Sequence, residues 1–191
     1  MKVGKDTFIF NITSATECPS RPLGLCQIPD KCYAMKAERM YKQNLPYKIR
    51  QTKYWDENTP GKIALDFDQK IGHLNAYRKK RGGELIKYVR IGESGDFRNQ
   101  EDLDKAFKFA MYLSKLQSDV IIYGFTARSD LDFSKRPENY VINGSGFMID
   151  NSFNVAPKSE LDKYENVCAG NCRNCDLCKH KLGLDIYVGI H

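Results

Sequence analysis

Val120-Ile-Ile-Tyr-Gly-Phe125 is the longest apolar run of this sequence. A continuous apolar run of this length is typical of a β-strand that is buried on both faces, as the strands of parallel sheets are. A helical pattern precedes it, starting at Asn99 or Gln100, in which Leu103 and Phe107 lie on one stripe. Together they indicate a strand–helix–strand unit, which is the building block of parallel α/β folds.

The same alternation continues in both directions along the chain. The sequence predicts strands at 7–13, 85–91, 120–125, 141–143, 147–150 and 184–190, and helices at 32–41, 47–57, 60–81, 99–114 and, in short form, 129–136. A complete eight-unit (β/α) barrel needs about 250 residues. With 191 residues, we expect an α/β fold that forms a shortened or incomplete TIM-like (β/α) barrel with a cysteine-rich C-terminal loop.

Three chemically rich loops each follow a predicted strand. They are 18–32 after the first strand, 92–96 after the second and 126–130 after the third. Because functional sites in parallel α/β folds gather at the carboxyl ends of the strands, we expect these loops to meet on one rim. The candidate cofactor-binding residues in the second and third loops are Gly92, Glu93, Ser94, Asp96, Thr126 and Arg128.

Each polar side chain among these candidates also has a structural interpretation. Glu93 could bind an amine, and Asp96 could bind a ribose hydroxyl or orient a neighbouring arginine. The alternative is a turn in which Asp96 caps the next helix. Arg128 could bind a carboxylate or phosphate through two parallel hydrogen bonds. It could equally form an ion pair with Asp130 or Asp132.

Cysteine content gives the strongest chemical signal. The chain has seven cysteines, and four of them fall within eleven residues near the carboxyl end. The sequence starts without the apolar core of a signal peptide, and no stretch approaches the roughly 20 apolar residues of a membrane span. We therefore expect a cytoplasmic protein without a membrane partner. In reducing cytosol, clustered thiols indicate metal binding or catalysis rather than disulfides.

The C-terminal group consists of Cys168, Cys172, Cys175 and Cys178, separated by three, two and two residues. Closely spaced thiolates in one loop can bind different irons of a cubane cluster. A structural zinc ion more often takes pairs of ligands from two separated knuckles. We therefore predict an iron–sulfur cluster of the 4Fe–4S type, with zinc as the alternative metal.

The N-terminal group is formed by Cys18, Cys26 and Cys32, with seven and five residues between them. Cys32 is expected near the start of a helix, where the helix dipole favours a thiolate. The alternative is that these three thiols are simply buried. Two partitions remain open. The N-terminal three could hold one cluster with an open iron while the C-terminal four hold a second, or both ends could share one cluster. Residues 1–191 would in either case form a single iron–sulfur domain.

Two segments of the N-terminal loop carry a family resemblance. Thr16-Glu-Cys-Pro-Ser-Arg-Pro-Leu-Gly-Leu-Cys26, followed by Cys32-Tyr-Ala-Met-Lys-Ala-Glu-Arg39, resembles the gene-product-88 family of phage-encoded proteins. The segment Arg90–Phe97, the segment at Thr126 and the terminal cysteines are also similar to it. The resemblance covers most of the chain. It implies a phage origin, a location in the host cytoplasm and a barrel-like iron–sulfur protein.

A looser resemblance is to radical-SAM enzymes. These enzymes place three cysteines after the first strand, often ending in Cys-Tyr, as Cys32-Tyr33 does here. They also place a Gly-Glu pair after the second strand, like Gly92-Glu93, to bind the amine of S-adenosylmethionine. The resemblance implies S-adenosylmethionine as a candidate ligand and an unidentified small-molecule substrate. The N-terminal cysteines are spaced far more widely here than in those enzymes.

The charge and the aromatic content of the chain are also compatible with anionic partners, including nucleic acid. The net charge of +6 modestly favours an anionic partner. Basic residues between 36 and 53 are interleaved with aromatic residues, a pattern that can bind nucleic acid, although a solvated helical surface is the favoured interpretation. The three hypotheses are a radical-SAM-like enzyme, a non-catalytic iron–sulfur protein that serves a redox partner or nucleic acid, and a zinc-stabilised interaction module.

Overall fold

The computed structural model describes residues 4–173 and 175–190. The strands are β1 (Thr7–Phe10), β2 (Tyr88–Ile91), β3 (Ile121–Thr126), β4 (Tyr140–Ser145), β5 (Asn151–Ala156) and β6 (Asp185–Gly189), and the helices are α1 (Tyr33–Met40), α2 (Asn44–Glu57), α3 (Pro60–Lys79) and α4 (Gln100–Leu116). Short 3₁₀ helices lie at Pro29–Lys31, Lys158–Lys163 and Leu177–Lys179. No helix in the described ranges is both long and apolar enough to cross a membrane.

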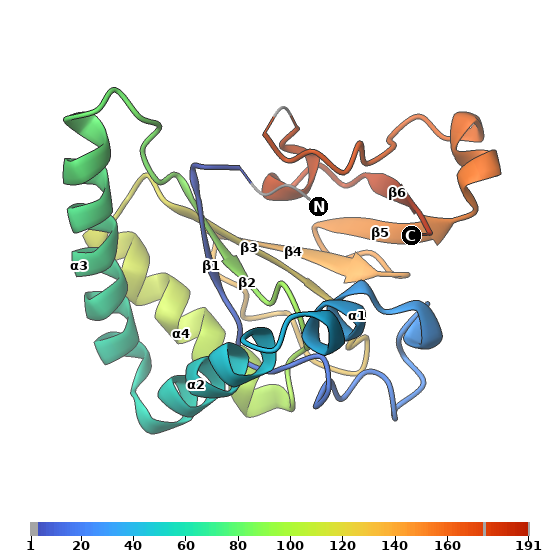
Figure 1. Ribbon diagram of the computed structural model, residues 1–191, viewed down its shortest axis with the longest axis horizontal. Helices are drawn as coiled ribbons and strands as arrows, with labels where there is room; N and C mark the ends of the chain where they lie inside the picture. Colours follow the sequence, from blue (N-terminus) through green and yellow to red (C-terminus); the bar gives the residue numbers. More distant parts are fainter. Residues whose placement is uncertain (1–3, 174, 191) are drawn as a thin grey trace.

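The six strands form one sheet in the order β1-β2-β3-β4-β5-β6, and every neighbouring pair is parallel (Figure 1). Consecutive parallel strands lying side by side are the arrangement of a (β/α) barrel. Within the described ranges β1 and β6 each pair with one strand only, so the sheet stays open. The prediction of an α/β fold with an incomplete barrel-like sheet and a cysteine-rich C-terminal segment is confirmed.

Helix ends follow the local signals in the sequence. The Thr59 side chain accepts a hydrogen bond from Lys62 N and caps α3, and Asn99 caps α4 in the same way. The second helix begins three residues earlier than predicted, at Asn44. Pro46 falls within its first turn, where a missing backbone N–H costs no helical hydrogen bond.

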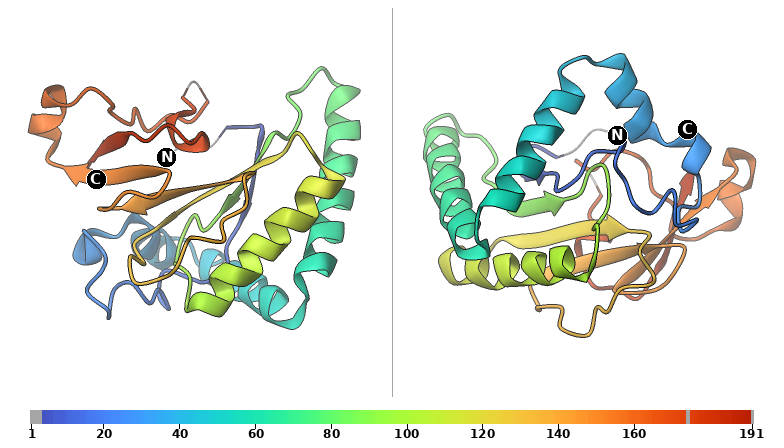
Figure 2. Two further views of the ribbon diagram at one scale, coloured as in Figure 1. Left: turned by 180° about the vertical axis from the view of Figure 1, so that it is seen from behind. Right: turned by 90° about the horizontal axis from the view of Figure 1, so that it is seen from below.

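Helices α3 and α4 lie side by side and cover one face of the sheet (Figures 1 and 2). Val89, Ile91 and Ile122 project toward these helices and join a large apolar core. Trp55 on α2 is fully buried in that core, and its indole N–H donates to Asp102 on α4 (3.0 Å). The long connection between β1 and β2 is thereby fixed on the same side of the sheet.

Alternate residues of the same strands project to the opposite face. Tyr88, Tyr123, Phe125 and Phe153 form a continuous aromatic layer there. Centroid separations are 6.2 Å for Tyr88–Tyr123, 6.4 Å for Tyr123–Phe125 and 4.9 Å for Phe125–Phe153. This is the face that the inside of a closed barrel would present, and both cysteine-bearing segments border it.

The prediction of a strand at 147–150 is wrong, because that stretch is the connection between β4 and β5. Asp150 fixes its course. Its carboxylate accepts hydrogen bonds from Ile142 N (2.8 Å) and from Arg136 (2.6 Å), and its backbone N–H donates to Ile142 O (3.1 Å). The strand begins at the next residue, Asn151.

The predicted short helix at 129–136 is also wrong. The Asp132 carboxylate accepts hydrogen bonds from the backbone and the side chain of Ser134, which holds a turn in place of a helix. The first strand ends at Phe10 rather than at residue 13. Asn11 and Thr13 instead bond the loop that follows β2, at Ser94 N and Asp96 N.

Candidate metal centre

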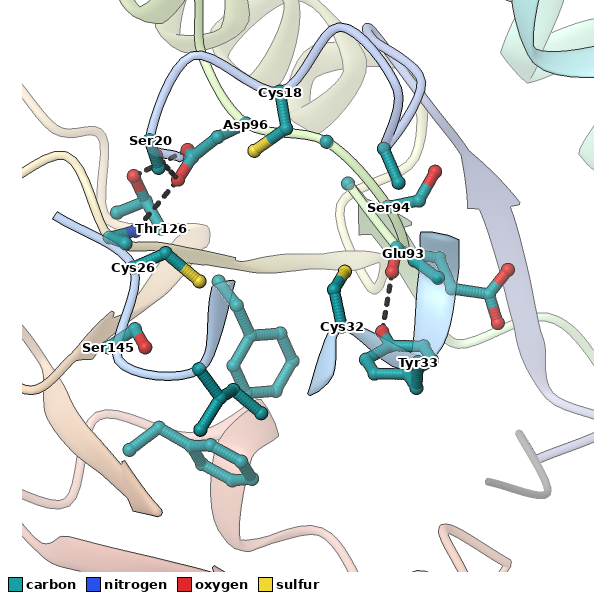
Figure 3. Close-up of a pocket in the computed structure, with 18 of the residues that line it drawn as sticks. Cys18, Ser20, Cys26, Cys32, Tyr33, Glu93, Ser94, Asp96, Thr126 and Ser145 are labelled. Atoms are coloured by element: carbon teal, nitrogen blue, oxygen red, sulfur yellow. Dashed lines mark hydrogen bonds between the residues drawn. The ribbon is translucent and has the colours of Figure 1, made fainter. Parts of the chain in front are cut away.

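A cavity of about 430 Å³ lies at the carboxyl ends of the strands and is bordered by all three N-terminal cysteines. Figure 3 shows the sulfur atoms of Cys18, Cys26 and Cys32 pointing into the same space. The three predicted loops do meet on this rim, since residues of the segments after β1, β2 and β3 all line the cavity. Three separate contacts hold the cysteine loop around it.

The first contact is the buried carboxylate of Asp96. It accepts hydrogen bonds from Ser20 Oγ (2.7 Å), Thr126 Oγ1 (2.6 Å), Ala127 N (2.8 Å) and Phe97 N (2.8 Å), as Figure 3 shows in part. Burial raises the pKa of Asp96, and the four donors partly offset this. The carboxylate ties the loop, two residues after its first cysteine, to the ends of β2 and β3.

The second contact is made by the Gln27 side chain, directly after the second cysteine. Its amide nitrogen donates to Ser145 Oγ (2.9 Å) and Phe153 O (2.9 Å), and its oxygen accepts from Val155 N (3.1 Å). Gln27 therefore bonds β5 at the point where β5 continues past the end of β4, as a further backbone segment would. The loop is closed against β4 and β5 at this point.

The third contact follows the third cysteine. Tyr33 Oη donates to the backbone oxygen of Glu93 (2.6 Å; Figure 3). The loop after β2 also lies close against Thr13 at Gly95, which has a φ of +72° and where a Cβ would lie 2.1 Å from Thr13 Oγ1. Each N-terminal cysteine is thus followed within two residues by its own anchor on the sheet, which compensates for the wide spacing in sequence.

The start of the cysteine loop is held by a buried ion pair. Glu38 on α1 accepts hydrogen bonds from Ala15 N (2.8 Å) and from Thr16 N (3.0 Å) and Oγ1 (2.9 Å). Lys48 on α2 lies 3.2 Å from the same carboxylate, with side-chain exposures of 4% for Lys48 and 2% for Glu38. Burial opposes ionisation, but these donors and Lys48 lower the pKa of Glu38 overall.

Five of the six predicted cofactor-binding residues border the cavity, namely Gly92, Glu93, Ser94, Asp96 and Thr126. The carboxylates have different surroundings. That of Asp96 is occupied by the four donors above, whereas the carboxylate of Glu93 points away from the three sulfur atoms in Figure 3. The Ser94 hydroxyl is buried and has no hydrogen-bond partner among the described residues.

Arg128 does not border the cavity. Its guanidinium donates twice to Asp130 (2.8 Å each) and also to the backbone oxygens of Phe97 and Arg98. These bonds correspond to the structural interpretation of Arg128, in which it pairs with Asp130. Arg128 therefore acts in this structure as a brace between the loops after β2 and β3.

Several residues that line the cavity are not among the predicted site residues. Arg90, at 4% exposure, lies on the cavity side of β2 with its guanidinium 5.0 Å from the centroid of the Phe125 ring. Arg21 and Lys31 add two more cations to the lining, and Phe153 adds an apolar wall. Side chains alternate between the two faces of the sheet along β2, so a position of Ile91 toward the helices puts Arg90 on the cavity side. This alternation is the one sequence signal that could have placed Arg90 there.

The C-terminal cysteines border a second recess, of about 10 Å³, lined by Cys168, Cys172, Cys175, Cys178 and by Phe153. Cys168 N donates to Tyr187 O of β6 (2.7 Å). Lys179, which is buried, lies over the Tyr88 ring at 4.2 Å. The four-cysteine segment therefore lies against the aromatic face of the sheet.

A pair of fully buried asparagines fixes that segment to the sheet. Asn143 Nδ2 on β4 donates to Cys178 O (2.9 Å) and to Gly124 O (3.0 Å). Asn151 Nδ2 on β5 donates to His180 O (2.8 Å) and to Asn143 Oδ1 (2.9 Å). Both asparagines are 0% exposed. Their amides give the chain around the last cysteine a defined position.

All seven cysteines are free thiols. Burial raises the pKa of Cys18 to about 11 and that of Cys178 to about 12, so both stay protonated at neutral pH unless a bound cation compensates the charge. In the described ranges, no three His, Cys, Asp or Glu side chains come close enough together to hold a single metal ion. A cubane differs from a single ion in that it places its ligands on separate irons. The cavity is lined by the cations of Arg21, Lys31 and Arg90 as well as by the three thiols.

Comparison with known proteins identifies a family. A family model described as gene product 88 matches residues 2–169, a range that includes the N-terminal cysteine loop, strands β1 to β5 and Cys168. No curated protein and no solved structure is significantly similar to the chain.

Proposed function

The chain belongs to the gene product 88 family, and on that premise we propose that it is an iron–sulfur protein in which Cys18, Cys26 and Cys32 hold a 4Fe–4S cluster. The observation that carries the proposal is the convergence of these three thiols on one cavity at the carboxyl rim of the sheet. Three protein ligands leave the fourth iron open to the remaining space of the cavity.

The open iron makes an enzyme of the radical-SAM-like type the leading function. When bound, such a cluster supplies a coordination site for an exogenous ligand and a one-electron reductant. The residues around it would position that ligand. The guanidinium of Arg90 can bind a carboxylate, while Phe125 and Phe153 form an apolar part of the lining next to it. S-adenosylmethionine carries both an amine and a carboxylate and is the first ligand to test.

Electron transfer without catalysis is the second candidate. The C-terminal group favours it, because a cluster with four cysteine ligands has no open iron. Nucleic-acid binding has less support within the basic segment, since Lys48 and Trp55 are buried and Tyr54 donates to Asp66 (2.6 Å). Tyr41 and Tyr47 remain exposed on that surface. A zinc-stabilised interaction module is the weakest proposal.

The open iron is tested by ligand perturbation of the reduced protein. We expect cyanide and S-adenosylmethionine each to change the electron paramagnetic resonance spectrum of anaerobically reconstituted, dithionite-reduced protein, because each coordinates the iron that lacks a cysteine. A spectral change with cyanide alone would support an iron without a cysteine ligand but would contradict S-adenosylmethionine as the ligand of that iron. A cluster whose spectrum changes with neither ligand would contradict the enzyme proposal and favour electron transfer.

A further inference from the structure

The two cysteine groups border different recesses. Among the described residues, the large cavity is lined by the three N-terminal cysteines and the small recess by the four C-terminal ones, and no cysteine lines both. A single cluster with ligands from both ends would require thiols of both groups to border one volume. The arrangement instead separates the thiols into sets of three and four.

The partition between the two recesses is one side chain thick. Phe153 lines both, and its ring packs edge-on against Phe125 at 4.9 Å. Arg90 lies over Phe125 and borders the large cavity. Phe153 is therefore the side chain that the two recesses share.

The position of the four-cysteine segment does not depend on the N-terminal loop. Asn143 and Asn151 hold it to β4 and β5 from within the sheet, and Lys179 approaches Asp6 at 3.9 Å beside it. The large cavity is instead closed by Asp96, Gln27 and Tyr33. Each group of thiols therefore has its own supporting contacts.

We propose that Cys168, Cys172, Cys175 and Cys178 hold a second 4Fe–4S cluster, separate from that of the N-terminal cysteines, with Phe153 between the two. The inference rests on the proposed function for the N-terminal cysteines and assigns the C-terminal cysteines a cluster of their own. The four thiols that line the small recess are the ligand set that a four-cysteine cluster takes.

Two double variants, each of which removes two cysteines of one group, test whether the two groups hold separate clusters. Wild-type protein reconstituted anaerobically is expected to contain roughly eight irons per chain, and Cys172→Ala/Cys175→Ala and Cys18→Ala/Cys26→Ala are each expected to retain roughly four. Full iron content in the Cys172→Ala/Cys175→Ala variant would overturn the second cluster. Loss of nearly all iron from either variant, with the circular dichroism of the wild type retained, would show one shared cluster and overturn the partition.

The spectrum of the wild type gives a test that needs no variant. Two reduced clusters separated by one side chain interact magnetically, so we expect a signal broadened relative to that of either variant. A narrow spectrum of a single non-interacting cluster in the wild type would contradict the proposal. Failure of the proposed function looks different, because the Cys18→Ala/Cys26→Ala variant would then keep all of the iron that the wild type binds.

Discussion

Replacing Asp96 with alanine is expected to destabilise the fold by about 3 kcal/mol or more and to prevent cluster uptake at the N-terminal cysteines. Each buried donor left without a partner costs about 1–3 kcal/mol. The Asp96→Ala variant leaves Ser20 Oγ, Thr126 Oγ1 and two backbone N–H groups without their hydrogen-bond acceptor. It also frees the loop that places Cys18 over the cavity, so the thiols lose their common orientation.

Chemical denaturation and iron analysis measure the two effects of Asp96→Ala. The matched control is Asp119→Ala, which removes an exposed carboxylate ahead of β3 and is expected to change the unfolding free energy by no more than about 0.5 kcal/mol. Wild-type stability together with wild-type iron content in Asp96→Ala would show that Asp96 does not hold the loop.

The Glu38→Gln substitution is expected to cost about 3 kcal/mol, because it leaves the buried ammonium of Lys48 without a countercharge. The new amide nitrogen also faces donors at Ala15 N or Thr16 N, where the carboxylate accepted hydrogen bonds. Denaturant unfolding at neutral pH measures the loss. The control is Glu57→Gln, whose pair with Lys53 is exposed and is expected to contribute less than about 1 kcal/mol.

The pH dependence of the Glu38→Gln effect has a definite sign. Because the folded protein lowers the pKa of Glu38, the stabilisation is complete above the unfolded value of about 4.3 and is lost as the pH falls through the lower folded value. The difference in unfolding free energy between wild type and Glu38→Gln should therefore shrink below about pH 4. A difference that stays constant or grows on acidification would mean that Glu38 is not ionised in the folded protein.

Strong local patterns predicted most of the secondary structure. The apolar run at 120–125 and the capping residues Thr59 and Asn99 act on the few residues next to them. The strand and the two helix starts were therefore predictable from the sequence. The strand at 147–150 could not be rejected in the same way. Asp150 turns that stretch by bonding Ile142 and Arg136, and such partners are known only once the chain is folded.

The candidate site, too, was predictable only in part from the sequence. The order of strands and loops was enough to expect the cysteine loop and the Gly92–Asp96 segment on one rim. The pair between Arg128 and Asp130 was one of the two interpretations that the sequence offered. The partners of Asp96 were not predictable, because they come from several loops at once. Gln27 and Phe153 belong to no motif, and their roles arise from the position of β5 beside the cysteine loop.

Iron and acid-labile sulfide analysis of the protein, purified without exposure to oxygen, tests the central claim most directly. The arrangement of the seven thiols predicts a coloured protein with iron and sulfide in equal amounts, roughly four of each for every cluster. A colourless protein that contains only zinc, or no metal, would contradict it.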